Sequence, residues 1–237
     1  MAQLFAGTSG FAYPNWKPGF YPRDLPQKKF LEHYATRLNS VEINYTFRRM
    51  PAAGTLAGWA AATPAGFRFA LKANQRITHF QKLKDAAQPT AYFLGALDPL
   101  RAAGRLGPVL FQLPPYLRCD VELLRDYLTL LPADVRTAFE FRHESWLVEP
   151  VYQVLAERNV SLCVAESDRL TVPQVVTADF VYFRLRKPEY GPDEIATMRT
   201  RARDLVGGGK DVFVFFKHED TPDGALCAEQ LLGTSAD

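Results

Sequence analysis

Aromatic rings alternate with charged side chains in one stretch of this chain. Phe139 and Phe141 share one parity, and Glu140 and Arg142 share the other, which is the period of a β-strand. The segment continues directly into His143. A carboxylate near cations is suited to proton transfer, and an arginine is suited to bidentate capture of an anion. We interpret the segment as an inner strand whose carboxyl end supplies chemistry.

Polar side chains of one parity also occur at the ends of other strand-like segments. They are Glu42, Asn44, Lys72, Gln112, Glu166, Arg184 and Lys217. The opposite parity is rich in phenylalanine, which should face surrounding helices, so the polar parity should face the axis of a closed sheet. Any one of these charges could belong to a buried salt bridge or to the rim. Together they predict a pocket, because burying so many charges is costly unless they pair or bind a ligand.

The order of the segments predicts an α/β fold, a TIM-like (β/α)8 barrel. Strand-like segments occur at 4–10, 41–44, 67–72, 109–112, from 137, at 162–165, 180–185 and 212–216. Helix-like segments alternate with them at 27–38, 56–61, 90–103, 120–131, 149–158, 193–206 and up to 232. Only about a dozen residues separate the sixth and seventh strands, so we expect an abbreviated sixth helix. With no linker and no internal repeat, we expect residues 1–237 to form a single domain.

Charge in the predicted pocket favours an anionic ligand. Four cations (Lys72, Arg142, Arg184, Lys217) face three carboxylates (Glu42, Glu140, Glu166), a surplus of one positive charge. A phosphate, a carboxylate or an acidic sugar would suit such a site. A self-neutralising network that binds nothing charged is the alternative. No G-x-G-x-x-G motif follows a strand, so we expect no dinucleotide and no other cofactor.

Bulk properties restrict the partners and the compartment. The net charge is only +2, and the arginines at 199, 201 and 203 are better explained as a solvated helix face than as a nucleic-acid interface. The three cysteines form no C-x-x-C motif and fit a reducing compartment. The amino terminus lacks the features of a signal peptide, and no apolar run approaches the ~20 residues of a membrane helix. We expect a cytoplasmic protein without membrane association.

Nearly the whole chain resembles the YecE-like family, also called domain of unknown function family 72. The matching stretches are 7–16 (GTSGFAYPNW), 20–22 (FYP), 41–47 (VEINYTF), 67–72 (FRFALK), 77–79 (ITH), 107–115 (GPVLFQLPP), 140–143 (EFRH), 145–146 (SW) and 180–185 (FVYFRL). The resemblance implies a TIM-like barrel and supplies no activity. The family often has Asp where this chain has Glu166, and His-Gly where it has Arg186 and Lys187, so a phosphate-binding turn is not implied there.

Three functional hypotheses follow. In the first, an enzyme uses Glu140 as general acid or base on an anionic sugar or phosphorylated metabolite, with Glu42 or Glu166 as its partner and Lys72 stabilising negative charge. Ligand contacts would come from Arg142, His143, Arg184, Gln112, Asn44, Lys217, Tyr13 and Trp16. Paired carboxylates would also suit glycoside hydrolysis.

The second hypothesis is a metal-dependent hydrolase or isomerase with ligands among Glu42, Glu140, Glu166, His143 and His218. Nearby lysines and arginines would repel a cation, so we expect no metal. The third is a nucleic-acid-processing or non-catalytic binding protein. There the aromatic first loop, with Tyr13, Trp16, Phe20 and Tyr21, would be a packed lid or a stacking platform.

Overall fold

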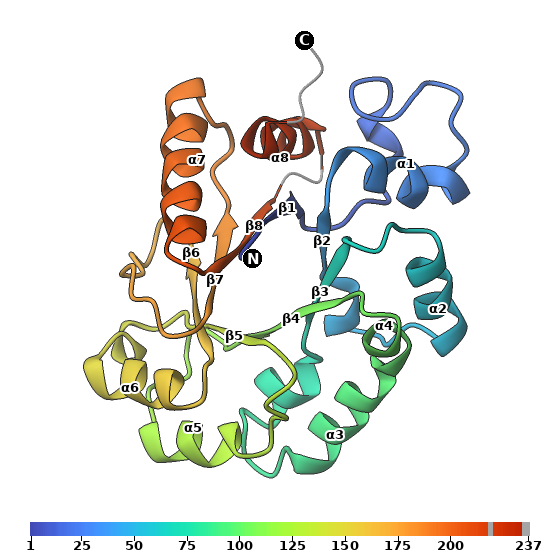
Figure 1. The fold of residues 1–237 in the computed structure, drawn as a ribbon. Coiled ribbons are helices and arrows are strands. Elements are labelled where there is room, and N and C mark those ends of the chain that lie inside the picture. Colours follow the sequence, from blue (N-terminus) through green and yellow to red (C-terminus); the bar gives the residue numbers. More distant parts are fainter. Residues whose placement is uncertain (218–219, 234–237) are drawn as a thin grey trace.

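The structure is a computed structural model that describes residues 1–217 and 220–233. Eight strands form one parallel sheet in the order β1-β8-β7-β6-β5-β4-β3-β2, with helices around it (Figure 1). The strands are β1 (Leu4–Thr8), β2 (Ser40–Ile43), β3 (Arg68–Lys72), β4 (Leu106–Gln112), β5 (Thr137–Glu140), β6 (Ser161–Ala165), β7 (Phe180–Leu185) and β8 (Asp211–Phe216). The predicted TIM-like barrel is confirmed, in a nearly closed form.

Helices follow seven of the eight strands and pack on the outside of the barrel. They are α1 (Phe30–Arg37), α2 (Ala53–Ala61), α3 (Ala87–Ala96), α4 (Asp98–Ala102), α5 (Val121–Leu128), α6 (Glu149–Glu157), α7 (Pro192–Gly207) and α8 (Asp223–Leu232). Helix α5 shows why such segments dock: Leu124, Tyr127 and Leu128 are buried at helical spacing. Its first turn is capped by Asp120, whose side chain accepts from the backbone N–H of Leu123.

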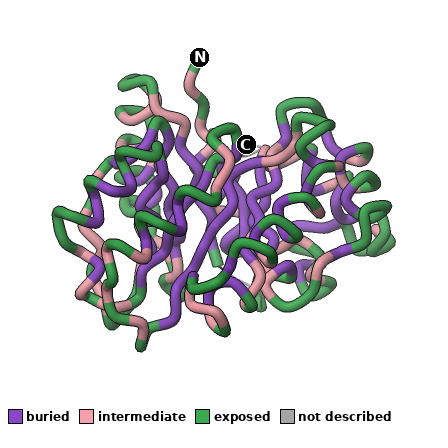
Figure 2. Tube along the Cα trace, turned by 90° about the horizontal axis from the view of Figure 1, so that it is seen from below, coloured by how far each residue is buried: buried purple, intermediate pink, exposed green. Residues whose placement is uncertain are grey.

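The two faces of the sheet carry different side chains. Phe69, Phe111 and Phe139 belong to the large apolar cluster between the sheet and the helices. A second cluster fills the barrel interior, with Leu110, Tyr182 and Phe213 among its members. The strands therefore form the most deeply buried part of the molecule, as Figure 2 shows. The predicted assignment of the aromatic parity to the helix-facing side is confirmed.

The sheet closes between β1 and β2 without a regular ladder. An isolated parallel bridge pairs Ser9 with Glu42 across this seam, where the N–H of Gly10 donates to the carbonyl of Glu42 at 2.9 Å. Side chains supply further links. Asn39, just before β2, donates to the carbonyl of Leu4 and accepts from the N–H of Ala6, both at 2.8 Å. Tyr34 likewise joins Thr8 to Ser40.

Two predicted helices differ in the structure. The expected abbreviated sixth helix is absent, because residues 166–179 run from β6 to β7 as irregular chain. The expected helix at 90–103 is instead the pair α3 and α4, with Leu97 between them. In the first loop, Trp16, Phe20 and Tyr21 are buried against one another, as expected of a packed segment. None of the described helices is long and apolar enough to cross a bilayer.

Candidate active site at the carboxyl ends of the strands

A buried arginine joins two carboxylates at the top of the barrel interior. Arg184, on β7, donates through Nη2 to Oε1 of Glu42 at 2.7 Å and through Nη1 to Oε2 of Glu140. All three side chains are at most 2% exposed. Because they come from β7, β2 and β5, the barrel brings together residues that lie up to 142 positions apart in the sequence.

Glu42 is held as a carboxylate by four donors. Besides Arg184, its Oε1 accepts from Ser9 at 2.7 Å and from Asn44 at 3.0 Å, and its Oε2 accepts from Tyr182 at 2.8 Å. Burial alone would raise the pKa of Glu42, but the charge and hydrogen bond of Arg184, the charge of Arg186 and the hydrogen bond from Ser9 lower it to about 2. Glu42 is therefore ionised throughout the neutral range.

Glu140 is held in the same way. Its Oε1 accepts from Gln112 at 2.9 Å and from Nε of Arg142 at 2.8 Å. Burial opposes ionisation, yet the charges of Arg184, Arg142 and Arg186 keep the pKa of Glu140 well below its usual range. Such a carboxylate holds a proton too weakly to act as a general acid near neutral pH, so its geometry favours an electrostatic role over the expected proton transfer.

Lys72 ends β3 on the parity of the buried Ala70 and has a different environment. Its Nζ lies 4.2 Å from the ring centroid of Phe47 and forms no ion pair within the described chain. Burial lowers the pKa of Lys72 to about 8, helped by the charge of Arg184 and opposed by Glu140 and Glu42. Of the expected catalytic groups, Lys72 therefore has a pKa suited to proton transfer near neutral pH.

A cavity of about 490 Å³ opens beside this network. Its wall combines the ends of β5, β6, β7 and β8 with the irregular segment 166–179. The charged residues that line it are Glu140, Arg142, Glu166, Asp168, Arg169, Arg186, Lys187 and Lys217. Five cations and three carboxylates leave a surplus of two positive charges, compared with the surplus of one predicted from sequence.

Arg186 is a lining residue that the sequence analysis did not select. Its side chain makes no hydrogen bond or ion pair with the described residues, and its Nε is buried without a partner. Burial and the charge of Arg184 lower the pKa of Arg186. The signal was available, since Arg186 has the same parity as Arg184 two residues earlier.

Glu166, an expected catalytic group, positions the chain around Arg186. Its Oε2 accepts from the backbone N–H of Arg186 at 2.7 Å and of Lys187 at 3.3 Å, and from the hydroxyl of Tyr190. Asn44 lies within the network, 3.4 Å from Nη2 of Arg184, and Lys217 is exposed on the cavity wall. The structure thus brings most of the predicted residues to one end of the barrel.

Three expected ligand contacts have structural roles instead. Nδ1 of His143 accepts from the N–H of Ser145 at 3.1 Å and caps the helical turn Glu144–Trp146. Trp16 is fully buried, and the hydroxyl of Tyr13 donates to the carbonyl of Ser9 at 2.8 Å. Because Trp16, Phe20 and Tyr21 are buried, those rings offer no stacking surface for bases.

Known proteins are similar to this chain over nearly its whole length. The profile of the family described as "Protein of unknown function DUF72" matches residues 5–236. The chain belongs to the DUF72 family. The UPF0759 protein YunF of Bacillus subtilis (strain 168) is 27% identical over 97% of this chain and 93% of YunF.

Solved structures of DUF72 proteins share the fold. The Thermotoga maritima protein is 27% identical, with a TM-score of 0.86 over 98% of both chains. The Enterococcus faecalis protein is 21% identical, with a TM-score of 0.80 over 98% of this chain and 97% of its own. These likenesses bear out the family resemblance read from the sequence motifs.

The expected metal ligands of this DUF72 protein are not arranged as a metal site. Among residues 1–217 and 220–233, no group of three or more His, Cys, Asp or Glu side chains is placed to hold an ion. Glu42 and Glu140 already bind Arg184, whose charge would repel a cation. His218, another suggested ligand, lies outside the described residues.

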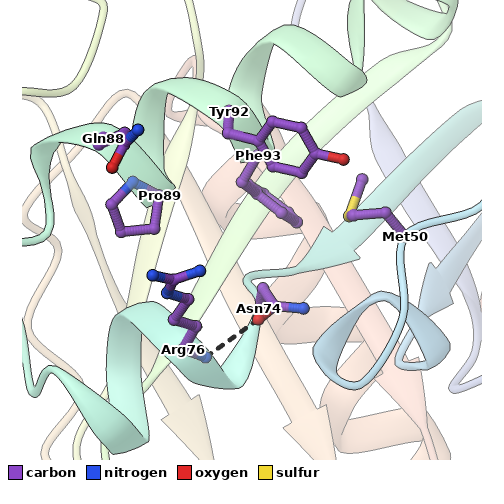
Figure 3. Close-up of a pocket in the computed structure, with 7 residues that line it drawn as sticks. All are labelled: Met50, Asn74, Arg76, Gln88, Pro89, Tyr92 and Phe93. Atoms are coloured by element: carbon purple, nitrogen blue, oxygen red, sulfur yellow. Dashed lines mark hydrogen bonds between the residues drawn. The ribbon is translucent and has the colours of Figure 1, made fainter.

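A second cavity of about 580 Å³ lies on another part of the DUF72 barrel, between α3 and the segments that follow β2 and β3 (Figure 3). Met50, Gln88, Pro89, Tyr92 and Phe93 line it together with Asn74 and Arg76. The backbone N–H of Arg76 donates to Oδ1 of Asn74 at 3.0 Å. No carboxylate, imidazole or lysine lines this cavity, so it lacks groups for acid–base chemistry near neutral pH.

Proposed function

We propose that this protein is an enzyme that performs acid–base chemistry on an anionic small molecule at the carboxyl ends of the barrel strands. The observation that carries the proposal is the contrast between Lys72 and its neighbours. Lys72 has a pKa of about 8, whereas Glu42 and Glu140 are held ionised by Arg184. Groups whose pKa values are separated by their surroundings are typical of acid–base sites.

The roles differ from those first assigned to the carboxylates. Lys72 would transfer the proton, because about half of its amines are neutral near pH 8. The Glu42–Arg184–Glu140 network would set the field at Lys72 and hold the strands in register. Arg184 is 1% exposed and both of its Nη atoms bind carboxylates, so the anion would bind to the accessible cations of the cavity wall rather than to Arg184.

Glycoside hydrolysis by Glu42 and Glu140 is not favoured by this geometry. Both carboxylates are buried and accept hydrogen bonds from the same guanidinium, and only Glu140 of the two lines the cavity, so they do not face each other across a space where a sugar could lie. A retaining or inverting mechanism needs two carboxyl groups on opposite sides of the scissile bond.

The test is a turnover screen of phosphorylated, carboxylated and sulfated sugars and small metabolites, repeated with Lys72→Met. We expect the variant to lose activity by about 10²-fold or more, the usual contribution of a general acid–base group. Lys84→Met is the matched control, because Lys84 is exposed on the same β3–α3 connection. Full activity in Lys72→Met would remove Lys72 from the mechanism, and a comparable loss in Lys84→Met would show that the effect is not specific to the site.

A further inference from the structure

The side chain of Arg186 makes no hydrogen bond or ion pair with the described residues. It lines the 490 Å³ cavity, and its Nε is buried with no hydrogen-bond partner. A buried guanidinium normally pairs with a carboxylate, because an unpaired buried charge is strongly destabilising. The charges of Arg184 and Arg142 oppose that of Arg186, and the nearby carboxylate of Glu140 favours it without a direct ion pair. An anion bound at Arg186 would satisfy both its charge and its donors.

The backbone around Arg186 is fixed in place. Glu166 accepts hydrogen bonds from the backbone N–H groups of Arg186 and Lys187 and from the hydroxyl of Tyr190. Glu166 therefore uses one oxygen to hold the turn and forms no ion pair with the Arg186 guanidinium. The turn therefore places the guanidinium of Arg186 at the cavity wall without an ion pair to Glu166.

Two more donors on the same wall are available. Arg142 uses Nε to bind Glu140, and neither of its Nη atoms has a partner among the described residues. Lys217 is exposed on the cavity wall and has no ion pair in the described chain. The cavity thus offers two guanidinium groups and one ammonium, and guanidinium groups match the oxygens of a phosphate in a bidentate manner.

We propose that Arg186, Arg142 and Lys217 form a subsite for the phosphate group of a phosphate monoester. Arg142 is paired with Glu140, whereas Arg186 and Lys217 form no ion pair in the described chain, so their two charges are available to a phosphate dianion. Three separate cationic donors also suit three terminal oxygens better than the two oxygens of a carboxylate. This inference rests on the proposed function, since it names the anionic group of that substrate. It can nevertheless be tested without turnover.

The experiment is titration of the intact protein with inorganic phosphate, followed by calorimetry and by ³¹P NMR. We expect saturable binding that Arg186→Met weakens at least tenfold and Lys217→Met weakens by a smaller factor. Arg118→Met, an exposed arginine after β4 that does not line the cavity, should bind phosphate as the parent does. Acetate should bind at least tenfold more weakly than phosphate.

Several outcomes would overturn the subsite. The first is binding that does not saturate by 10 mM phosphate, a concentration on the order of the Kd of weak anion sites. The second is an affinity for phosphate in Arg186→Met equal to that of the parent, and the third is acetate binding as tightly as phosphate. If Arg186→Met does not fold, Arg186→Lys keeps the charge but loses the bidentate fork, and unchanged affinity in Arg186→Lys and Lys217→Met together would count against the proposal.

Lys72→Met separates this inference from the proposed function. It should retain phosphate binding within about threefold, because the ammonium does not line the anion cavity. Phosphate binding that depends on Arg186, in a protein whose activity does not depend on Lys72, would leave the subsite standing and refute the assigned chemistry.

Discussion

The hydroxyl of Tyr182 donates a hydrogen bond of 2.8 Å to Oε2 of Glu42, from β7 to β2 through the barrel interior. No other described donor reaches that oxygen. Tyr182 is fully buried, and burial, together with the adjacent charge of Glu42, raises the pKa of Tyr182 well above its usual value. Near neutral pH, the phenol of Tyr182 therefore stays protonated and donates to a carboxylate that stays ionised.

Tyr182→Phe should destabilise the protein by about 2–3 kcal/mol, because it leaves a charged, buried oxygen without a partner. Tyr127→Phe is the matched control. Tyr127 is also buried, but its hydroxyl bonds the neutral hydroxyl of Thr90 at 3.0 Å, so its loss should cost only about 1 kcal/mol. Urea unfolding of both variants measures the difference. A smaller effect at Tyr182 than at Tyr127 would contradict a charged acceptor.

Arg184→Met should cost about 3–5 kcal/mol at pH 7, because it leaves the buried Glu42 with neutral donors alone and Glu140 with only Arg142 as its cation. In the parent, the lowered pKa values of Glu42 and Glu140 give stability that is present above the unfolded pKa of about 4.3 and is lost as the pH falls towards 2.

In the variant the pKa values of the two buried carboxyl groups should rise, so the difference in unfolding free energy between the two proteins should begin to shrink above about pH 4.3 and continue to shrink towards about pH 2. Unfolding free energies at pH 7, 5 and 3.5 test this. A difference that stays constant with pH would show that Arg184 does not act through the ionised carboxylates.

Lys72→Met should stabilise the protein at pH 7. The folded pKa of Lys72, about 8, lies below its ordinary value of 10.5, so folding disfavours the ammonium at neutral pH. That penalty is full below pH 8 and disappears as the pH rises towards 10.5, so the parent should gain on the variant over this range. Thermal melting at pH 7 and pH 9.5 measures the change. A variant that is less stable at pH 7 would show that the cation–π contact with Phe47 outweighs burial.

Gly7→Ala should destabilise the protein by at least about 1–3 kcal/mol. A Cβ on Gly7 would lie 1.8 Å from the carbonyl oxygen of Ser40, on the neighbouring strand of the seam. Gly58→Ala in the exposed part of α2 is the control, since a Cβ there meets nothing within 4 Å and should stabilise the helix by about 0.5–1 kcal/mol. Equal melting temperatures for the two variants would mean that the seam can open without cost.

The fold and the faces of its strands could be predicted from the sequence because both depend on local period. Alternation at 139–142 placed Phe139 outside and Glu140 inside, and the structure agrees. The region between β6 and β7 could not be predicted as well. Its short length suggested a reduced helix, but the segment lacks a helical period and contains Pro173, and the structure has no helix there.

The roles of individual charges depend on three-dimensional pairing, which no period records. Arg184 and Lys72 looked alike as cations at strand ends, yet Arg184 pairs with two carboxylates and Lys72 forms no ion pair with the described residues. Glu42 was also expected to line the pocket, whereas it is fully buried and does not line the cavity. Arg186 lines the cavity and was not among the predicted residues.

The seam between β1 and β2 gives the network a mechanical role. The carbonyl of Glu42 accepts a backbone hydrogen bond from Gly10 across the seam, and its carboxylate accepts hydrogen bonds from Ser9 and from Arg184. A change of charge near Arg184 should therefore affect the pairing of β1 with β2 through Glu42. The rate of amide hydrogen exchange at Gly10 should therefore report two things: whether the seam is closed, and whether an anion is bound in the cavity beside Arg184.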